Sequence, residues 1–353
     1  MVSGVGAPSE TSSGTALLGS DPLHELGVHS IALASFNVWG MPFGSTDVLS
    51  RPGRCGMEAA DALALAAGCS NTVLCFQEAW AFRCGLAWPL LALARAAERW
   101  APRSGPSSLD GGRALLSQIG QMNRPLTLLA LVVATLLSLV FPGRLLRWDG
   151  TRDEILRGLA ARGLLFAAGA HGSAGMPWCK LMDSGLLIVS SARPAAQGFV
   201  AYVATGGLAS EGMVTKGFLW ALYGSERQPG GQLVVTTHVH ATYAAVRLEQ
   251  CRQLLQAVES LCAQHEPSMT LLCGDFNEPP GGRLHEAIIA SPLGLRRLTD
   301  ASDVGTCRVA GDAVDVAELE LDHVYATTSG FAQLAPLFTP SSDHAIVRVR
   351  SEA

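Results

Sequence analysis

The chain has 353 residues, of which 48% are hydrophobic and 16% are charged, so a disordered protein is excluded and one large domain with a full core is expected. The net charge of −5 gives no overall positive field that would attract a nucleic acid backbone, which argues against a nuclease. Nine cysteines without a CxxC pair indicate neither a disulfide framework nor a zinc site, and we expect reduced, mostly buried thiols.

The start of the chain does not read as part of the core. The first twenty residues are rich in Gly, Ser and Thr, contain no Lys or Arg, and lack an apolar stretch long enough for a signal peptide. We therefore expect residues 1–29 to form a disordered leader and the protein to be intracellular. Residues 30–350 are predicted to form one domain with an apolar helical insertion at about 84–165.

Two apolar strands near the start of this domain each end on polar residues. Ser30–Phe36 stops at Asn37, and Thr72–Phe76 stops at Gln77 and Glu78. If the two strands are neighbours in one sheet, the side chains of Asn37 and Glu78 lie at the same edge of that sheet.

The insertion contains an uncharged segment at 125–142 that resembles a membrane helix. As a helix, its core would be about 24 Å long, which is shorter than the roughly 30 Å of a bilayer's hydrocarbon layer. A single crossing would also separate Glu78 from Asp275. A helix in one leaflet, a re-entrant hairpin with Leu86–Ala97 and a buried core helix remain, and we favour membrane contact. Five arginines near its end form either a basic groove or, as we favour, a solvated helix face: Arg144, Arg147, Arg152, Arg157 and Arg162.

The rest of the chain alternates short apolar runs with Gly, Pro and Ser, which predicts strands and turns. The predicted strands are Gly185–Ser190, Phe199–Ala204, Gly217–Tyr223, Gln232–Thr237, Met269–Cys273, Leu321–Ala326 and Ala345–Val349. Between them, Tyr243–Gln264 has apolar residues at helical spacing and is predicted to be an amphipathic helix. This order indicates two sheets packed face to face with helical covers.

Polar residues that could carry chemistry stand at the ends of these strands. Met269–Cys273 runs through Gly274 into Asp275 and Asn277, whose alternate spacing sends both side chains to one side if the strand geometry continues. Such a turn is common without any function. Other polar residues also stand at or next to the ends of predicted strands, however, namely His238, His240, Asp322, Asp343 and His344.

The order of these groups along the chain resembles the motif series of the endonuclease/exonuclease/phosphatase superfamily. The series is Asn37, Gln77-Glu78, Thr237-His238, Gly274-Asp275-Phe276-Asn277, Asp322 and Ser342-Asp343-His344. The resemblance covers most of residues 30–350 and implies a four-layered, DNase I-like α/β sandwich with its site at the edge of the sheets.

Other stretches are similar to the neutral sphingomyelinase branch of that superfamily. They are Asn-Val-Trp-Gly-Met-Pro at 37–42, Gln-Glu-Ala-Trp at 77–80, Ser184-Gly185-Leu186, Arg193-Pro194, Lys216-Gly217 and Thr237-His238-Val239-His240-Ala241. The chain departs from that pattern in two respects. Glu211 stands where the family has the aspartate that partners the lysine of its lysine-glycine motif, and the segment between Glu78 and Ser184 is longer than usual.

The resemblance implies a Mg²⁺-dependent phosphodiesterase that hydrolyses sphingomyelin to ceramide and phosphocholine at a membrane surface, with Mn²⁺ as an alternative ion. Glu78, Asn37 and Asp343 would serve the metal, and Lys216, Glu211 and His240 the substrate. His344 would act as general base or transition-state stabiliser, oriented by Asp322. The remaining expected catalytic residues are Asp275, to position or activate water, and Asn277 and His238, to donate hydrogen bonds.

Three other functions use the same residues or the same fold. An endonuclease or an inositol phosphate phosphatase would need the same catalytic groups, although the acidic composition and the apolar segment favour a lipid over a nucleic acid. An inactive membrane-associated scaffold is the non-enzymatic alternative, and it is disfavoured because every expected catalytic position holds a competent side chain. Nothing in the sequence implies a protein partner.

Overall fold

The computed structural model describes residues 30–38, 58–61, 69–80, 150–169, 183–204, 214–224, 230–298, 305–309, 317–339 and 342–352. The expected leader 1–29, the apolar segment 125–142, the possible hairpin partner at 86–97 and Glu211 lie outside these described residues. Among the helices of the described part, none is long and apolar enough to cross a membrane.

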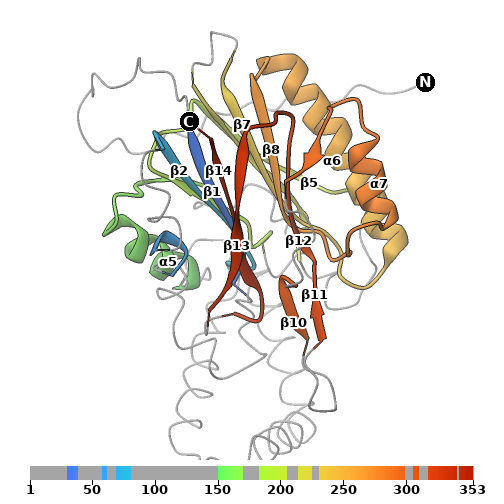
Figure 1. The fold of residues 1–353 in the computed structure, drawn as a ribbon, viewed down its shortest axis with the longest axis horizontal. Coiled ribbons are helices and arrows are strands. Elements are labelled where there is room, and N and C mark those ends of the chain that lie inside the picture. Colours follow the sequence, from blue (N-terminus) through green and yellow to red (C-terminus); the bar gives the residue numbers. More distant parts are fainter. Residues whose placement is uncertain are drawn as a thin grey trace, which may run out of the picture.

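Two six-stranded mixed sheets pack face to face, with helices on their outer sides (Figure 1). The first sheet has the order β13 (Phe331–Phe338), β14 (Ala345–Ser351), β1 (Ile31–Asn37), β2 (Asn71–Gln77), β4 (Leu187–Ser190) and β3 (Phe166–Ala168). The second has the order β5 (Ala196–Ala201), β6 (Gly217–Tyr223), β7 (Gln232–His238), β8 (Met269–Asp275), β12 (Asp322–Ala326) and β9 (Arg296–Arg297). The predicted α/β sandwich is thus confirmed.

The smaller elements complete the layers. The outer helices are α5 (Gly150–Ala160) beside the first sheet, and α6 (Ala244–His265) and α7 (Arg283–Ile289) beside the second (Figure 1). A short hairpin is formed by β10 (Cys307–Val309) and β11 (Ala317–Leu319).

Strand register explains why polar residues from distant parts of the chain meet. β1 and β2 are parallel neighbours, so Asn37 pairs with Gln77 at their carboxyl ends. β7 and β8 are also parallel, and His238 pairs with Asp275. The antiparallel strand β12 begins opposite that point, with Asp322 facing Asp275 across the ladder. The ends of four strands and the start of a fifth therefore form one polar edge.

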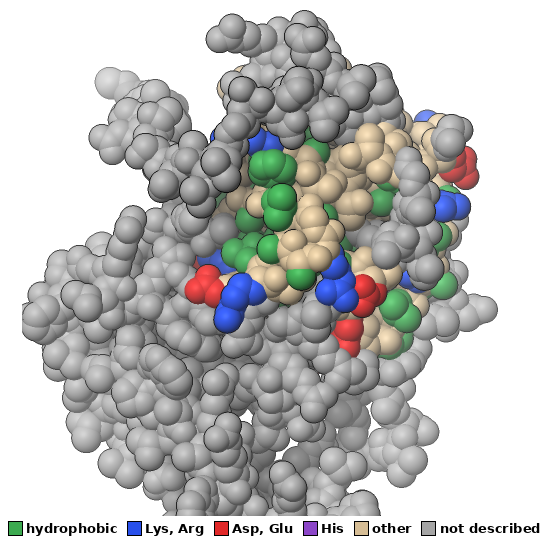
Figure 2. Space-filling model, turned by 90° about the vertical axis from the view of Figure 1, so that its left-hand side faces the viewer, with side chains coloured by type: hydrophobic (Ala, Val, Ile, Leu, Met, Phe, Trp, Pro, Cys, Tyr) green, Lys and Arg blue, Asp and Glu red, His purple; other side chains and the backbone are tan. Residues whose placement is uncertain are grey.

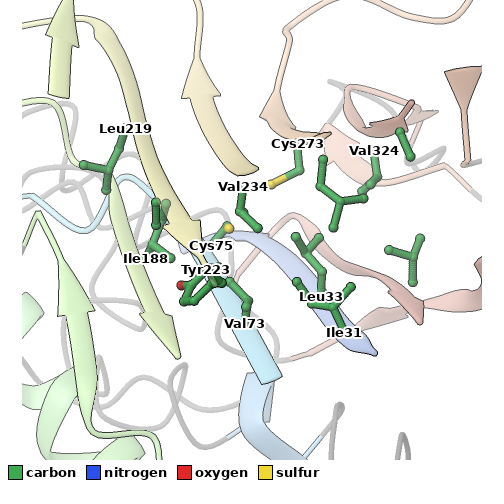
Figure 3. Close-up of a cluster of buried hydrophobic side chains, with 14 of the residues drawn as sticks. Ile31, Leu33, Val73, Cys75, Ile188, Leu219, Tyr223, Val234, Cys273 and Val324 are labelled. Carbon is green, nitrogen blue, oxygen red and sulfur yellow. The ribbon is translucent and has the colours of Figure 1, made fainter. Parts of the chain in front are cut away.

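The core between the two sheets consists of buried apolar side chains. Side chains from β1, β2 and β4 face those from β6, β7, β8 and β12 (Figure 3), and the labelled members are Ile31, Leu33, Val73, Cys75, Ile188, Leu219, Tyr223, Val234, Cys273 and Val324. At the polar end of this core, the buried amide of Gln77 donates to Ser35 Oγ at 3.1 Å and to Thr236 Oγ1 at 2.9 Å. Gln77 thereby links the two sheets next to the site.

The helices cover the outer faces in the way their sequences require. On α6, Cys251, Leu254, Leu255 and Val258 are buried at helical spacing and pack on the second sheet. On α5, Ile155 and Leu159 are buried against the first sheet. The described cysteines are all free thiols, and Cys75, Cys251, Cys273 and Cys307 are buried, as expected.

The three described arginines near the insertion form neither the basic groove nor the uniformly solvated face considered from the sequence. Arg152 is fully buried and pairs with Asp183, with 2.7 Å between Arg152 Nη2 and Asp183 Oδ2. Arg157 is exposed, and Arg162 pairs with Asp61 at 2.8 Å. Charged side chains of both signs lie side by side on the described surface of this face (Figure 2). Arg144 and Arg147 lie outside the described residues.

Candidate active site

The centre of the site is an amide held between two carboxylates. Asn37, at the end of β1, donates from Nδ2 to Asp275 Oδ2 at 2.9 Å and to Glu78 Oε1 at 3.3 Å. Asn37 and Asp275 are buried and Glu78 is nearly so, with 13% of its side chain exposed. Residues 37, 78 and 275 therefore converge from the ends of β1, β2 and β8; the sequence predicted a shared sheet edge for Asn37 and Glu78, whereas β8 belongs to the second sheet.

The loop after β2 holds Glu78 in an unfavourable backbone conformation. Glu78 has φ of 60°, in the left-handed region that non-glycine residues seldom adopt. The next residue is fixed on both sides, because Ala79 N donates to Gly185 O at 2.8 Å and Ala79 O accepts from Arg152 Nη2 at 3.1 Å. The surrounding contacts thus keep Glu78 pointing into the site.

Two histidines face Asp275 from opposite strands. His238 Nε2 lies 3.7 Å from Asp275 Oδ2 and 3.9 Å from Glu78 Oε1. His344 Nε2 lies 3.9 Å from Asp275 Oδ2, while its Nδ1 is 2.8 Å from Asp322 Oδ2. Asp322 is fully buried, and its backbone N–H donates to Thr306 Oγ1 at 2.9 Å, which fixes its position. The Asp322–His344 pair is therefore rigidly oriented.

Burial shifts the pKa values of Glu78 and His238 in opposite directions. Burial raises the pKa of Glu78 to about 7, with Asp275 adding to the rise and Lys216 opposing it. Burial and the charge of Lys216 lower the pKa of His238 to about 3. At neutral pH His238 is therefore a neutral imidazole, and Glu78 is only partly ionised, so a bound cation would favour its carboxylate form.

The other three ionisable residues, His344, Asp322 and Asp275, are charged at neutral pH. Burial alone would lower the pKa of His344, but the contact with Asp322 raises it well above the usual value. Burial raises the pKa of Asp322 to about 6, so Asp322 is ionised and His344 protonated at neutral pH. Burial also opposes ionisation of Asp275, yet the histidines and the hydrogen bonds from Asn37 and Asn277 lower its pKa. Asp275 is thus an anion beside a cation.

The turn after β8 fixes Asp275 through backbone contacts. Gly274 has φ of 142°, and a Cβ atom there would lie 2.0 Å from Thr237 O, so only glycine allows β7 and β8 to approach this closely. Asn277 has φ of 49° and does not continue the strand. Its N–H donates to Asp275 Oδ1 at 2.8 Å, and its Nδ2 donates to Val239 O at 3.3 Å. The two side chains therefore take different directions from those expected of an extended strand.

Of the three residues predicted to bind the substrate, Lys216 and His240 are described, and both are buried. Lys216 is buried, so the alternative of an exposed surface amine is wrong, and its Nζ donates to Val239 O at 3.1 Å. His240 is also buried, and its Nδ1 accepts the backbone N–H groups of Thr242 and Tyr243, both at 3.1 Å. The His240 ring thus stabilises the turn before α6. Glu211 lies outside the described residues.

Asp343 lies on the His344 side of the site. Its Oδ1 is 4.0 Å from His344 Nε2, and 29% of its side chain is exposed. The preceding residue anchors this loop, because Ser342 Oγ donates to Asn37 O at 2.6 Å and accepts from His344 N at 3.1 Å. Asp343 is therefore grouped with His344 by its measured contacts, whereas Glu78 and Asn37 form the opposite side.

Three residues that shape the site carried no recognisable signal as functional residues. Arg152 and Asp183 support the loop of Glu78, but a single arginine in a helical stretch is more often solvated. Cys307 lies beside His344, forming a β-bridge with it, and is an isolated cysteine in the sequence. Only the tertiary fold, through the packing of α5 and the β-bridge of Cys307, brings them to the site.

The residues on the β1–β2 side fit a hard divalent cation. Glu78 Oε2 is buried and makes no hydrogen bond within the described structure. A buried carboxylate oxygen without a donor is the kind of hard oxygen ligand that Mg²⁺ and Mn²⁺ prefer, and Asn37 Nδ2 joins this carboxylate to that of Asp275. A second group, Asp275, Asp322 and His344, has one donor atom from each residue within 4.8 Å of the others.

Comparison with known proteins defines the class of fold. No protein-family model matches the sequence, and no curated protein matches it. Among solved structures, SmcL superposes with a TM-score of 0.55 at 14% identity, covering 92% of this chain and 99% of its own. An endonuclease/exonuclease/phosphatase family protein from Bacteroides thetaiotaomicron gives 0.51 at 12% identity, covering 91% and 97%. The chain therefore has the fold of the endonuclease/exonuclease/phosphatase superfamily, as the sequence predicted.

A more particular neighbour is the sphingomyelinase C from Streptomyces griseocarneus. Its TM-score is 0.50 at 15% identity, and the alignment covers 92% of this chain and 99% of that enzyme. A sphingomyelinase-like structural relative is thus present, and at this identity the likeness defines the fold.

Proposed function

We propose that this protein is a divalent-metal-dependent phosphodiesterase that hydrolyses sphingomyelin to ceramide and phosphocholine at a membrane surface. The observation that carries the proposal is the convergence of Asn37, Glu78, Asp275 and His238 with the Asp322–His344 pair. The choice of sphingomyelin is supported by the motifs shared with neutral sphingomyelinases and by the sphingomyelinase C with the same fold.

The metal belongs on the β1–β2 side of the site. Glu78 would be its principal ligand, and the Asn37 side chain would help to hold the ion or a phosphate oxygen. A bound Mg²⁺ would supply positive charge that neutralises the phosphate oxygens. The buried Lys216 adds to the positive potential at Glu78 and His238, and its Nζ donates to Val239 O.

Asp275 is placed to orient the attacking water. Both of its oxygens are already fixed, Oδ1 by the Asn277 N–H and Oδ2 by Asn37 Nδ2. Because its lowered pKa makes it a weak base, its contribution is to accept a hydrogen bond from the water and hold it in line with the phosphorus.

The histidines supply donors for the developing charge. His344 is protonated because of Asp322, so of the two roles expected from the sequence we assign it that of transition-state stabiliser. His238 is neutral and retains one N–H, which can donate to a phosphate oxygen or to the leaving ceramide oxygen. Protonating the alkoxide is the step for which His344 holds a transferable proton.

An endonuclease or a phosphatase acting on inositol phosphates is the second candidate, because the same fold occurs in a family whose name includes both activities. The net charge of −5 favours a lipid headgroup over a nucleic acid. An inactive scaffold is the least favoured, since each catalytic position in the described site retains its functional side chain.

The proposal is tested by presenting purified protein with sphingomyelin liposomes, plasmid DNA and an inositol polyphosphate, each with Mg²⁺, Mn²⁺ or EDTA. We expect phosphocholine release that requires the divalent ion. The isosteric variant Asp275→Asn should reduce this release by at least roughly 10²-fold, while the exposed-site control Asp153→Asn should not. Nicked DNA or free phosphate with intact lipid would replace the proposal with the second candidate.

A further inference from the structure

A second set of metal-ligating side chains shares His344 with the site and adds Cys307 and Asp343, which the proposed reaction does not use. Cys307, Asp343 and His344 each offer one donor atom, and the three atoms all lie within 4.8 Å of one another. This set differs in chemistry from the oxygen-rich side around Glu78, because it contains a thiol and an imidazole.

The geometry identifies which nitrogen of His344 a metal would use. Nδ1 is committed to Asp322 Oδ2 at 2.8 Å, whereas Nε2 is 4.0 Å from Asp343 Oδ1. The Cys307 side chain forms a hydrogen bond with the His344 ring. A histidine that ligates a metal through one nitrogen and donates from the other to a carboxylate is the usual arrangement in zinc sites. Asp322 already occupies the position of that carboxylate.

The backbone holds the three donors in place. Cys307 and His344 form a β-bridge, and Ala345 N donates to Thr306 O at 2.6 Å. Thr306 in turn accepts from the N–H of Asp322 through its hydroxyl at 2.9 Å. Asp343 is partly exposed, whereas Cys307 and His344 are buried, so the carboxylate connects the three donors with solvent. A site with fixed ligands loses little conformational entropy on binding.

A thiolate, an imidazole and a carboxylate together select a softer ion than Mg²⁺, and three protein ligands leave the fourth tetrahedral position of Zn²⁺ for water. We propose that Cys307, Asp343 and His344 form a zinc site, and that zinc bound there inhibits the enzyme by occupying His344 Nε2. Zinc binding itself requires no assumption about the substrate, whereas the inhibition rests on the proposed function.

Binding is tested on the full chain freed of metal, titrated with Zn²⁺ by calorimetry and with Co²⁺ by absorption spectroscopy. We expect one tight zinc equivalent and a thiolate-to-cobalt charge-transfer band. Since losing an outer-sphere partner of a zinc ligand costs roughly 10- to 100-fold in affinity, losing the thiolate in Cys307→Ser should weaken binding by at least about 100-fold and abolish the band. The matched control Cys262→Ser, a partly buried thiol on α6, should bind as the wild type does.

Two further variants separate this site from its neighbours. Asp343→Asn should also weaken zinc binding, and it provides a second test if Cys307→Ser does not fold by circular dichroism. Glu78→Gln should retain the zinc site, because it alters the oxygen-rich side alone. Wild-type protein without the cobalt band, or equal zinc affinity in the wild type and Cys307→Ser, would overturn the proposal.

Activity then tests the inhibition separately. Submillimolar zinc should suppress Mg²⁺-supported phosphocholine release in the wild type and in Cys262→Ser, and Cys307→Ser should require at least about tenfold more zinc for the same suppression. Equal zinc sensitivity of the three proteins would refute the inhibition. A protein that shows the cobalt band but hydrolyses no sphingomyelin would retain the zinc site and refute the proposed function instead.

Discussion

Asp322 is the partner that keeps His344 charged. It raises the pKa of His344 well above the usual value, so activity that depends on protonated His344 is present below that pKa and is lost as pH rises through it. In Asp322→Asn, burial is no longer opposed by this carboxylate, and the alkaline limb of kcat should move to lower pH. We also expect kcat near neutral pH to fall by roughly 10²- to 10⁴-fold. Both are measured from a pH–rate profile.

The acidic neighbours of His344 that remain in that variant are Asp275 and Asp343, at 3.9 Å and 4.0 Å from Nε2. They retain part of the positive shift, so the alkaline limb should move without the whole profile being lost. An unchanged alkaline limb with a lower kcat would show that Asp322 acts on ring orientation alone.

Glu78 gives the metal-free protein a pH-dependent weakness. Its pKa rises to about 7 in the folded state because of burial, while an unfolded glutamate ionises near 4.3. The folded state binds the proton more tightly, so the stability from this group is lost as pH rises from about 4 to about 7. In EDTA at pH 8, Glu78→Gln should therefore unfold with a free energy roughly 1–3 kcal/mol higher than that of the wild type.

Urea denaturation at pH 4 and pH 8 measures this difference, which should nearly vanish at pH 4. Saturating Mg²⁺ should stabilise the wild type far more than Glu78→Gln, because the neutral amide is a poorer ligand. The exposed change Glu249→Gln on α6 is the control, and because it keeps Glu78, its stability should depend on pH and metal as that of the wild type does. Stabilisation of the wild type and Glu78→Gln by Mg²⁺ to the same extent would place the ion elsewhere.

At the scale of elements, the buried side chain of Arg152 joins α5 to the loop of Glu78 by a hydrogen bond and to Asp183 by an ion pair. Arg152 donates to Asp183 and to Ala79 O, and neither its Nε nor its Nη1 makes a hydrogen bond among the described residues. Arg152→Met would remove the opposite charge from the buried Asp183, which keeps the hydrogen bond from Gly185 N, at an expected cost of about 3–5 kcal/mol in the free energy of unfolding. Arg157→Met, on the exposed side of the same helix, should change it by less than about 0.5 kcal/mol.

The same pair makes α5 a supporting element of the metal side. Calorimetric titration of Arg152→Met with Mg²⁺ should show weaker binding than in Arg157→Met, because the carbonyl beside Glu78 has lost its donor. Equal affinities would show that the ion pair stabilises the fold without setting the conformation of the loop.

The elements that deliver the site were predictable because each combines a buried apolar run with a polar end. Gly217–Tyr223 was predicted with the bounds of β6, and β1, β2, β7 and β8 end within two residues of their predictions. β5 ends at Ala201 instead of Ala204, since Tyr202 turns inward to bond Thr237 at 2.6 Å. The half-exposed β13 was missed, because its burial lacks a clear period of two and a register shift interrupts its ladder.

The remaining misses are short or depend on pairing across the fold. β3, β9, β10 and β11 have two or three residues each, too few for a periodic pattern. α7 has seven residues, and α5 was absorbed into the expected insertion. At residue level, the burial of Lys216 and the packing of Cys307 against His344 follow from tertiary contacts that no local spacing encodes.

At the scale of the whole molecule, charge distinguishes the lipid from the nucleic acid. A nuclease binds many phosphates, and its affinity for DNA falls by orders of magnitude when salt rises from about 50 mM to about 200 mM. This chain has a net charge of −5, and sphingomyelin has a zwitterionic headgroup with a single phosphate. We therefore expect kcat/KM on sphingomyelin liposomes to change by less than about threefold over that range of salt. Excess Mg²⁺ is present throughout, so that salt does not change the occupancy of the metal site. A steep decline with salt would instead indicate a polyanionic substrate or an anionic membrane surface, and repeating the titration on liposomes with and without an anionic lipid would decide between these two.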